Sequence, residues 1–151
     1  MLYMPLRYEL DTTELVMRAW QSNMTVCVPW VNYDQKRMLP MEIRSLNEPM
    51  DADRHGVRTP RAGAPVPVEI LDMVIVPGLG FDREGRRIGR GGGFYDRFLS
   101  QRDFHGTTCG IALHEQIIDD VPVVSHDIPL HMLVTDRDTL RFEMTQRSGA
   151  S

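Results

Sequence analysis

Residues 74–99 read V-I-V-P-G-L-G-F-D-R-E-G-R-R-I-G-R-G-G-G-F-Y-D-R-F-L. A short apolar run, residues 73–76, precedes a loop that holds seven glycines between Gly78 and Gly93. A wholly apolar run of this length is typical of a central strand in a parallel sheet. A helix is expected to begin after the loop, over residues 95–100. This order of strand, glycine-rich loop and helix predicts an α/β fold.

The loop Gly89-Arg90-Gly91-Gly92-Gly93 has the chemistry of a phosphate-binding site. It matches neither a Walker A motif, because no Gly-Lys-Ser/Thr follows, nor the dinucleotide pattern, because Phe94 replaces the last glycine. Consecutive glycines still allow several backbone N–H groups to converge on an anion. Arg87 and Arg90 can bind phosphate oxygens in bidentate fashion. The alternative is a flexible turn with solvated arginines, but the surrounding strand and helix favour phosphate binding.

Two carboxylates are candidates for a magnesium site. Asp96 lies in the first turn of the expected helix, and Asp127 lies in Val-Ser-His-Asp-Ile-Pro before the last expected strand. Beside a nucleotide, one or two carboxylates are what Mg²⁺ requires in addition to phosphate oxygens. Taken alone, Asp96 is better explained as a carboxylate favoured at a helix start. Asp127 is equally well explained as a loop cap.

Composition and charge restrict the possible functions. The chain has 151 residues, 42% of them hydrophobic, and a net charge of -4, which argues against nucleic acid as a partner. Between Asp82 and Arg97, however, five arginines face three carboxylates, a net charge of +2 that suits a small anion. Two cysteines without metal-ligand spacing indicate reduced thiols. With no signal-like start and no apolar run of about 20 residues, we expect a cytoplasmic protein without membrane contact.

The remaining segments predict one domain with a mostly parallel sheet. Residues 12–22 show helical spacing after an N-cap pair formed by Asp11 and Glu14. Residues 25–31 and 37–43 are expected to pair as a hairpin, and residues 107–113 and 132–135 to form buried strands. Residues 47–68 are expected to be a long irregular loop that could hold one helical turn near 51–55. We place the domain at 1–142 and a polar tail at 143–151.

Several blocks resemble a known family. Val76-Pro77-Gly78-Leu79-Gly80-Phe81-Asp82 and Gly85-x-Arg87-Ile88-Gly89-x-Gly91-Gly92-Gly93-Phe94-Tyr95-Asp96-Arg97 resemble the signature of 5-formyltetrahydrofolate cyclo-ligases, also called 5,10-methenyltetrahydrofolate synthetases. Met4-Pro5, Glu9 to Thr12, Val26 to Pro29, Gln116 to Pro122, His126-Asp127 and Val134-Thr135 are similar to further family elements in the same order.

The resemblance implies a three-layer α/β/α fold and a ligase of one-carbon metabolism. Such an enzyme uses ATP and Mg²⁺ to convert 5-formyltetrahydrofolate into 5,10-methenyltetrahydrofolate. Its partners are the reduced folate and ATP, and we expect a monomer or weak homo-oligomer. By resemblance, the catalytic residues are Arg87, Arg90 and Tyr95; the nucleotide site is Gly89, Arg90, Gly91, Gly92, Gly93, Phe94, Tyr95 and Asp96; Met4, Glu9 and Tyr95 bind folate; Asp96 and Asp127 hold the metal.

Two departures from the family pattern keep an alternative open. Family members begin with a further helix bearing a lysine and an arginine, and this chain is expected to start after that helix. Thr59-Pro60 stands where many bacterial relatives carry Glu-Pro. The alternative is a relative that binds folate or nucleotide without turnover. An RNA-binding module, suggested by the arginine cluster alone, is disfavoured by the acidic total charge.

Overall fold

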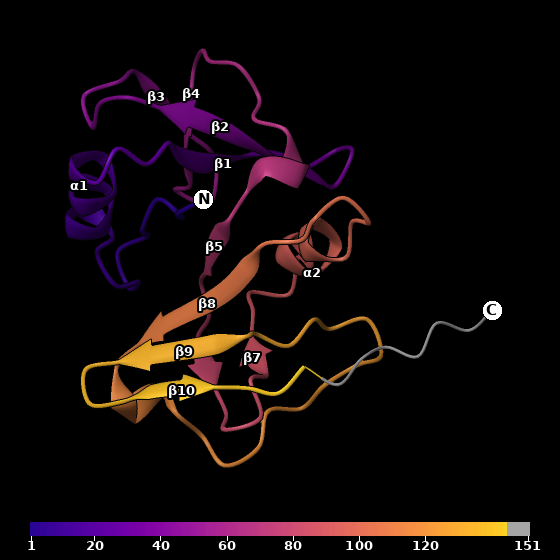
Figure 1. The fold of residues 1–151 in the computed structure, drawn as a ribbon. Coiled ribbons are helices and arrows are strands. Elements are labelled where there is room, and N and C mark those ends of the chain that lie inside the picture. Colours follow the sequence, from indigo (N-terminus) through magenta and orange to yellow (C-terminus); the bar gives the residue numbers. More distant parts are fainter. Residues whose placement is uncertain (145–151) are drawn as a thin grey trace.

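The computed structural model describes residues 1–144. Residues 1–144 form two α-helices and ten strands. Figure 1 shows how they are arranged. Their bounds are α1 Thr13–Gln21, β1 Val26–Asn32, β2 Arg37–Ile43, β3 Met50–Ala52, β4 Arg58–Pro60, β5 Met73–Val76, β6 Gly80–Phe81, β7 Arg87–Ile88, α2 Phe94–Leu99, β8 Thr107–Ala112, β9 Met132–Thr135 and β10 Thr139–Arg141. Two 3-10 turns, Val68–Ile70 and His114–Gln116, complete the order.

The main sheet is mixed, with the strand order β10-β9-β8-β5. β5 and β8 are parallel, β8 and β9 are parallel, and β10 returns antiparallel to β9. The parallel core therefore agrees with the sequence prediction. β8 rather than β5 occupies an inner position, so the apolar run 73–76 is not a central strand. The outer edge of β5 is covered by Met1, whose carbonyl oxygen accepts the Ile75 N–H at 2.9 Å.

The β1–β2 hairpin is the second sheet, paired from Val26↔Ile43 to Asn32↔Arg37. The N-terminal segment connects it to the main sheet, because the Leu2 N–H donates to the Cys27 carbonyl at 2.8 Å while Met1 bonds β5. Figure 1 shows the hairpin on one side of β5 and the strands β8 to β10 on the other.

Residues 47–68 differ from the irregular loop that was expected. β3 and β4 pair antiparallel in this segment, from Met50↔Pro60 to Ala52↔Arg58. The connecting turn is closed by hydrogen bonds, and residues 51–55 contain no helical turn. Three-residue strands are too short to show alternation, which explains why the sequence pattern missed them.

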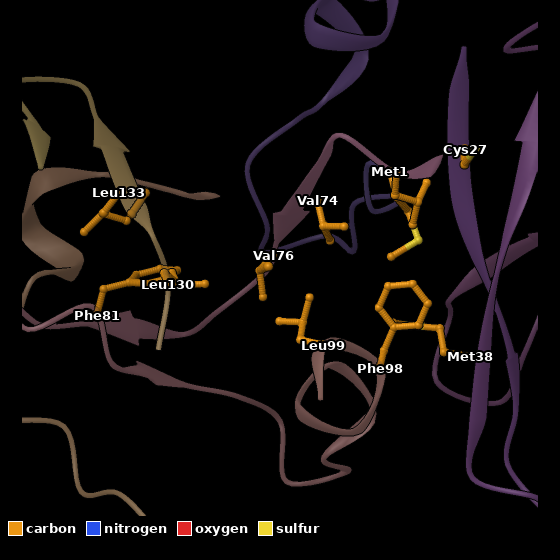
Figure 2. Close-up of a cluster of buried hydrophobic side chains, with 12 residues drawn as sticks. Met1, Cys27, Met38, Val74, Val76, Phe81, Phe98, Leu99, Leu130 and Leu133 are labelled. Atoms are coloured by element: carbon orange, nitrogen blue, oxygen red, sulfur yellow. The ribbon is translucent and has the colours of Figure 1, made fainter. Parts of the chain in front are cut away.

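Two buried clusters hold these elements together. In the first, Phe98 and Leu99 of α2 pack with Met38 of β2 and Val76 of β5. Figure 2 shows Phe98 between Met1 and Met38, with Leu99 next to Val76. In the second cluster, Val16 of α1 packs with residues of β1, β2 and β5. The packing of α2 against both sheets fixes the place where the glycine-rich loop ends.

The two α-helices are short. α1 has nine residues and α2 has six, so the three-layer α/β/α arrangement is not confirmed for residues 1–144. None of the helices in this range has the length and apolar character to cross a bilayer. Both cysteines are free and buried. Of the expected tail 143–151, residues 145–151 lie outside the described residues.

The expected N-cap pair of Asp11 and Glu14 is not confirmed, because the N-cap of α1 is Thr12, without a side-chain cap hydrogen bond. The Asp11 carboxylate accepts the Thr13 N–H at 2.9 Å and the Thr13 hydroxyl at 2.6 Å. Glu14 does not turn back to cap the helix; its carboxylate lies 2.8 Å from Arg18 Nη2 in an exposed ion pair.

A buried carboxylate organises the loops that follow β5. β6 and β7 pair as a small hairpin, and Asp82, 0% exposed, lies inside its turn. Asp82 Oδ1 accepts the N–H groups of Glu84 and Arg86, while Oδ2 accepts Arg86 Nε at 2.6 Å and the Val121 N–H at 3.0 Å. Burial alone would raise its pKa, but these hydrogen bonds hold the pKa of Asp82 below its ordinary value. The Asp82 side chain thus fixes both the turn that precedes Arg87 and the start of the segment that follows Val121.

Asp82→Asn is expected to destabilise the protein by about 2–4 kcal/mol. The substitution removes the charge and places an amide NH₂ group opposite buried N–H donors, with which it cannot form hydrogen bonds. The variant's loss in free energy of unfolding should be largest above the unfolded-state pKa of about 4. It should disappear as pH falls through the lowered folded-state pKa, because Asp82 then becomes protonated in the wild type too. Urea unfolding at several pH values measures it.

Asp120→Asn is the matched control, because Asp120 Oδ1 also contacts Arg86, at 2.7 Å, but its side chain is 76% exposed. Its unfolding midpoint should stay close to that of wild type. Equal losses in the two variants would contradict the role assigned to Asp82.

Candidate functional site

A single cavity of about 830 Å³ contains all the site residues that were proposed from the sequence. It lies between the N-terminal segment, the β1–β2 hairpin, the glycine-rich loop and the segment 122–127. Its volume is in the range usual for small-molecule sites. The proposed residues that line it are Met4, Glu9, Arg87, Gly89, Arg90, Gly91, Gly92, Gly93, Phe94, Tyr95, Asp96 and Asp127.

Glycine is required at two positions of the loop. Gly91 and Gly93 have φ values of 89° and 64°, in the left-handed region that favours glycine. Arg97 holds the loop from α2, because its Nη2 donates to the Gly92 carbonyl at 2.5 Å. α2 has only six residues, so the loop's own N–H groups, rather than a long helix dipole, are the main backbone donors at this wall.

Arg87 lies deep in the site, and not all of its N–H donors have a partner in the protein. Its side chain is 6% exposed, and its Nη2 lies 3.3 Å from Asp96 Oδ1. Its Cζ lies 5.7 Å from the centre of the Tyr95 ring. The buried Nε of Arg87 has no hydrogen-bond partner. Because a buried donor is rarely left unpaired in a native protein, this N–H indicates a place for an acceptor from a ligand.

The hydroxyl of Tyr95 is in the same situation. It is buried and has no hydrogen-bond partner. Burial raises the pKa of Tyr95 well above its ordinary value, so the group stays a neutral donor at physiological pH. Two unpaired donors, Arg87 Nε and the Tyr95 hydroxyl, therefore meet in one cavity.

Arg90 lies at the more exposed end of the loop and contacts the N-terminal segment. Its Nε is 3.4 Å from Glu9 Oε1, and its side chain is 48% exposed. Glu9 Oε2 accepts the Leu6 N–H at 2.8 Å, which fixes the carboxylate. Glu9 and Arg90, distant in sequence, thus share one side of the cavity.

The two acidic residues each have a structural role and one further oxygen. Asp96 Oδ1 accepts the Ile128 N–H at 3.0 Å, and Asp127 Oδ2 accepts the Val124 N–H at 3.0 Å. Asp127 therefore caps its loop, which was the alternative to a metal ligand that the sequence left open. Within residues 1–144, no group of three or more His, Cys, Asp or Glu side chains is placed to hold a metal. Two carboxylates that complete their shell with phosphate oxygens still fit the way proteins hold Mg²⁺.

Other lining residues were not found from the sequence. Tyr33 and His55 come from the turns of two different hairpins and reach the cavity beside Phe94. The Asp53-Arg54-His55-Gly56 pattern is a turn signal that could have marked the second hairpin. Nothing local in the sequence shows that the two turns meet.

Comparison with known proteins shows which family the chain resembles. Residues 1–136 match the model of the 5-formyltetrahydrofolate cyclo-ligase family. The chain is 33% identical over 139 residues to the 5-formyltetrahydrofolate cyclo-ligase of Escherichia coli strain K12, covering 84% of this chain and 71% of that protein. It is 31% identical over 113 residues to the Mus musculus enzyme of the same name, covering 72% and 52% of the two chains.

Solved structures give the same result. The NMR structure of Aquifex aeolicus 5,10-methenyltetrahydrofolate synthetase superimposes with a TM-score of 0.76 at 31% identity, over 99% of this chain and 72% of that one. The synthetase from Mycoplasma pneumoniae, at 19% identity and a TM-score of 0.68, shares the fold over 90% of this chain and 71% of its own. The chain therefore belongs to the 5-formyltetrahydrofolate cyclo-ligase family.

Proposed function

We propose that the chain catalyses the ATP-dependent conversion of 5-formyltetrahydrofolate into 5,10-methenyltetrahydrofolate, with release of ADP and phosphate. The observation that carries the proposal is the pair of buried, unpartnered donors on Arg87 and Tyr95, beside a loop of glycine N–H groups in one cavity. Membership of the cyclo-ligase family supports the choice of substrates.

The chemistry is a phosphoryl transfer followed by ring closure. The formyl oxygen attacks the γ-phosphorus of ATP, and ADP leaves. N10 of the folate then bonds to the activated formyl carbon, loses its proton, and the carbon–oxygen bond to phosphate breaks. Phosphoryl transfer mainly requires positioning and neutralisation of charge. No covalent nucleophile on the protein is needed.

The glycine loop and the arginines are assigned to the phosphates. The N–H groups of Gly89, Gly91, Gly92 and Gly93 face the triphosphate, and Phe94 flanks it. A guanidinium group has five N–H donors, and Arg87 uses only its Nη2 on Asp96, so its Nε is available for a phosphate oxygen. Arg90 reaches from the other side, where Glu9 orients it.

The folate is assigned to the N-terminal side of the cavity. Met4 and Glu9 would contact the reduced pterin and its formyl group, and the Tyr95 hydroxyl would donate to a ligand oxygen at the boundary of the two substrates. Asp96 and Asp127 would hold Mg²⁺, which when bound neutralises charge on the phosphate oxygens. Both carboxylates line the cavity, and Asp96 Oδ1 lies 3.3 Å from Arg87 Nη2.

Arg87→Ala is expected to lower kcat/KM for ATP by about one to two orders of magnitude, because a charge-assisted hydrogen bond contributes roughly 1.5–3 kcal/mol. The assay mixes protein, 5-formyltetrahydrofolate, ATP and Mg²⁺ and follows the absorbance of methenyltetrahydrofolate. Arg83→Ala is the control, since Arg83 is exposed on the same segment. A wild-type protein that binds ATP but never yields product would favour a binding protein instead.

Tyr95→Phe and Tyr3→Phe are expected to have opposite effects. The Tyr95 hydroxyl has no protein partner, so its removal should leave stability unchanged while kcat/KM falls about tenfold or more. The Tyr3 hydroxyl donates to the Leu10 carbonyl at 3.1 Å, so its removal should cost about 1 kcal/mol of stability with little change in turnover. Thermal unfolding and the product assay separate the two results. A loss of stability in Tyr95→Phe would contradict the ligand role.

A further inference from the structure

Three loops from distant parts of the chain meet at the ring of Tyr33. Tyr33 opens the turn between β1 and β2, His55 lies in the turn between β3 and β4, and Phe94 begins α2. The Tyr33 ring centroid lies 5.4 Å from that of His55 and 5.4 Å from that of Phe94, the latter in an edge-on arrangement at 79°. All three side chains line the cavity.

One carboxylate fixes this arrangement. Asp53 Oδ2 accepts the hydrogen bond of the Tyr33 hydroxyl. Asp53 Oδ1 accepts the N–H groups of His55 and Val57 at 2.7 and 2.9 Å, which closes the β3–β4 turn. Burial, followed by the bond to Asp53, raises the pKa of Tyr33 to about 12, so its hydroxyl remains a donor at physiological pH.

The hydrogen bond to Asp53 leaves the Tyr33 ring to act as an apolar surface. Around it the cavity is lined by Leu6, Val31, Met38 and Val57. The arginines and carboxylates of the phosphate site line the same cavity. Arg54 Cζ lies 5.7 Å from the centre of the Tyr33 ring and Arg97 Cζ 5.2 Å from that of Phe94. The cavity thus combines charged groups with aromatic rings, and aromatic side chains bind flat rings through stacked or edge-to-face contacts.

We propose that Tyr33 is a specificity-determining residue that forms, with Phe94, an aromatic wall for a planar ring of the ligand, and that Asp53 is its positioning residue. The inference rests on the proposed function, whose two substrates both carry such a ring: the p-aminobenzoyl ring of the folate and the adenine of ATP. The shared chemistry is a flat, uncharged aromatic ring joined to an anionic group.

Calorimetric titration with 5-formyltetrahydrofolate and, separately, with a non-hydrolysable ATP analogue tests the wall and identifies its ring. Tyr33→Ala should weaken one of the two ligands about tenfold and leave the other nearly unchanged. A loss for the folate assigns the p-aminobenzoyl ring, and a loss for the analogue assigns adenine. Tyr33→Phe keeps the ring, and its affinity for the same ligand should fall only about two- to threefold.

Tyr8→Ala is the control, because Tyr8 is 83% exposed and does not line the cavity. A folded Tyr33→Ala variant that binds both ligands as tightly as wild type would overturn the aromatic wall but leave the proposed function intact. A wild-type protein that binds neither ligand overturns the proposed function, and the inference with it.

A double-mutant cycle tests the role of Asp53. Serine at position 53 can still accept a turn N–H but is too short to reach the tyrosine hydroxyl. Asp53→Ser should weaken the ligand identified above two- to threefold in wild type and leave its affinity unchanged in Tyr33→Phe, since the hydroxyl is already absent there. The same loss in both backgrounds would show that Asp53 does not act through Tyr33.

Discussion

The carboxylate of Asp82 is the interaction on which the geometry of the site depends. It lies in the turn of the β6–β7 hairpin and accepts hydrogen bonds from that turn, from Arg86 and from Val121. Arg87 follows directly after this anchor, and the segment 122–127 follows Val121. A glycine-rich loop has few side chains with which to hold itself. Its placement therefore depends on this anchor before it and on α2, packed in the core, after it.

The cavity formed in this way combines two kinds of chemistry. It brings together guanidinium groups, carboxylates and glycine N–H groups, with two buried donors that lack protein partners. It is also lined by aromatic and aliphatic side chains, among them Tyr33, whose hydroxyl group donates to Asp53. A polyanion joined to flat rings suits both kinds of lining, which is the character of ATP and of a folate acting together.

Several strands and the site residues could be predicted because the sequence patterns that mark them are local. β2, β5 and β9 were predicted with their observed bounds, since β5 and β9 are short, mainly apolar runs and β2 was expected as the hairpin partner of the strand before it. The proposed site residues line one cavity because most belong to one continuous segment after β5. Their chemical roles stay predictions.

The errors have a common cause in tertiary contacts. β5 lies at the edge of its sheet, where Met1 from the distant N-terminus bonds to it, and the β3–β4 hairpin depends on Asp53 closing its turn. The strands β6 and β7 have two residues each and show no period of their own. Tyr33 and His55 were missed for the same reason, because only the folded chain brings their two turns together.

We propose that the N–H groups of residues 89–93 and the buried Nε of Arg87 bind the triphosphate of ATP. Titration of the labelled protein with a non-hydrolysable ATP analogue, followed by amide and arginine Nε NMR signals, tests this most directly. We predict that the signals of Gly91, Gly92, Gly93 and Arg87 Nε shift together, while those of α1 stay in place. Shifts confined to another part of the chain, with these signals unchanged, would contradict the account.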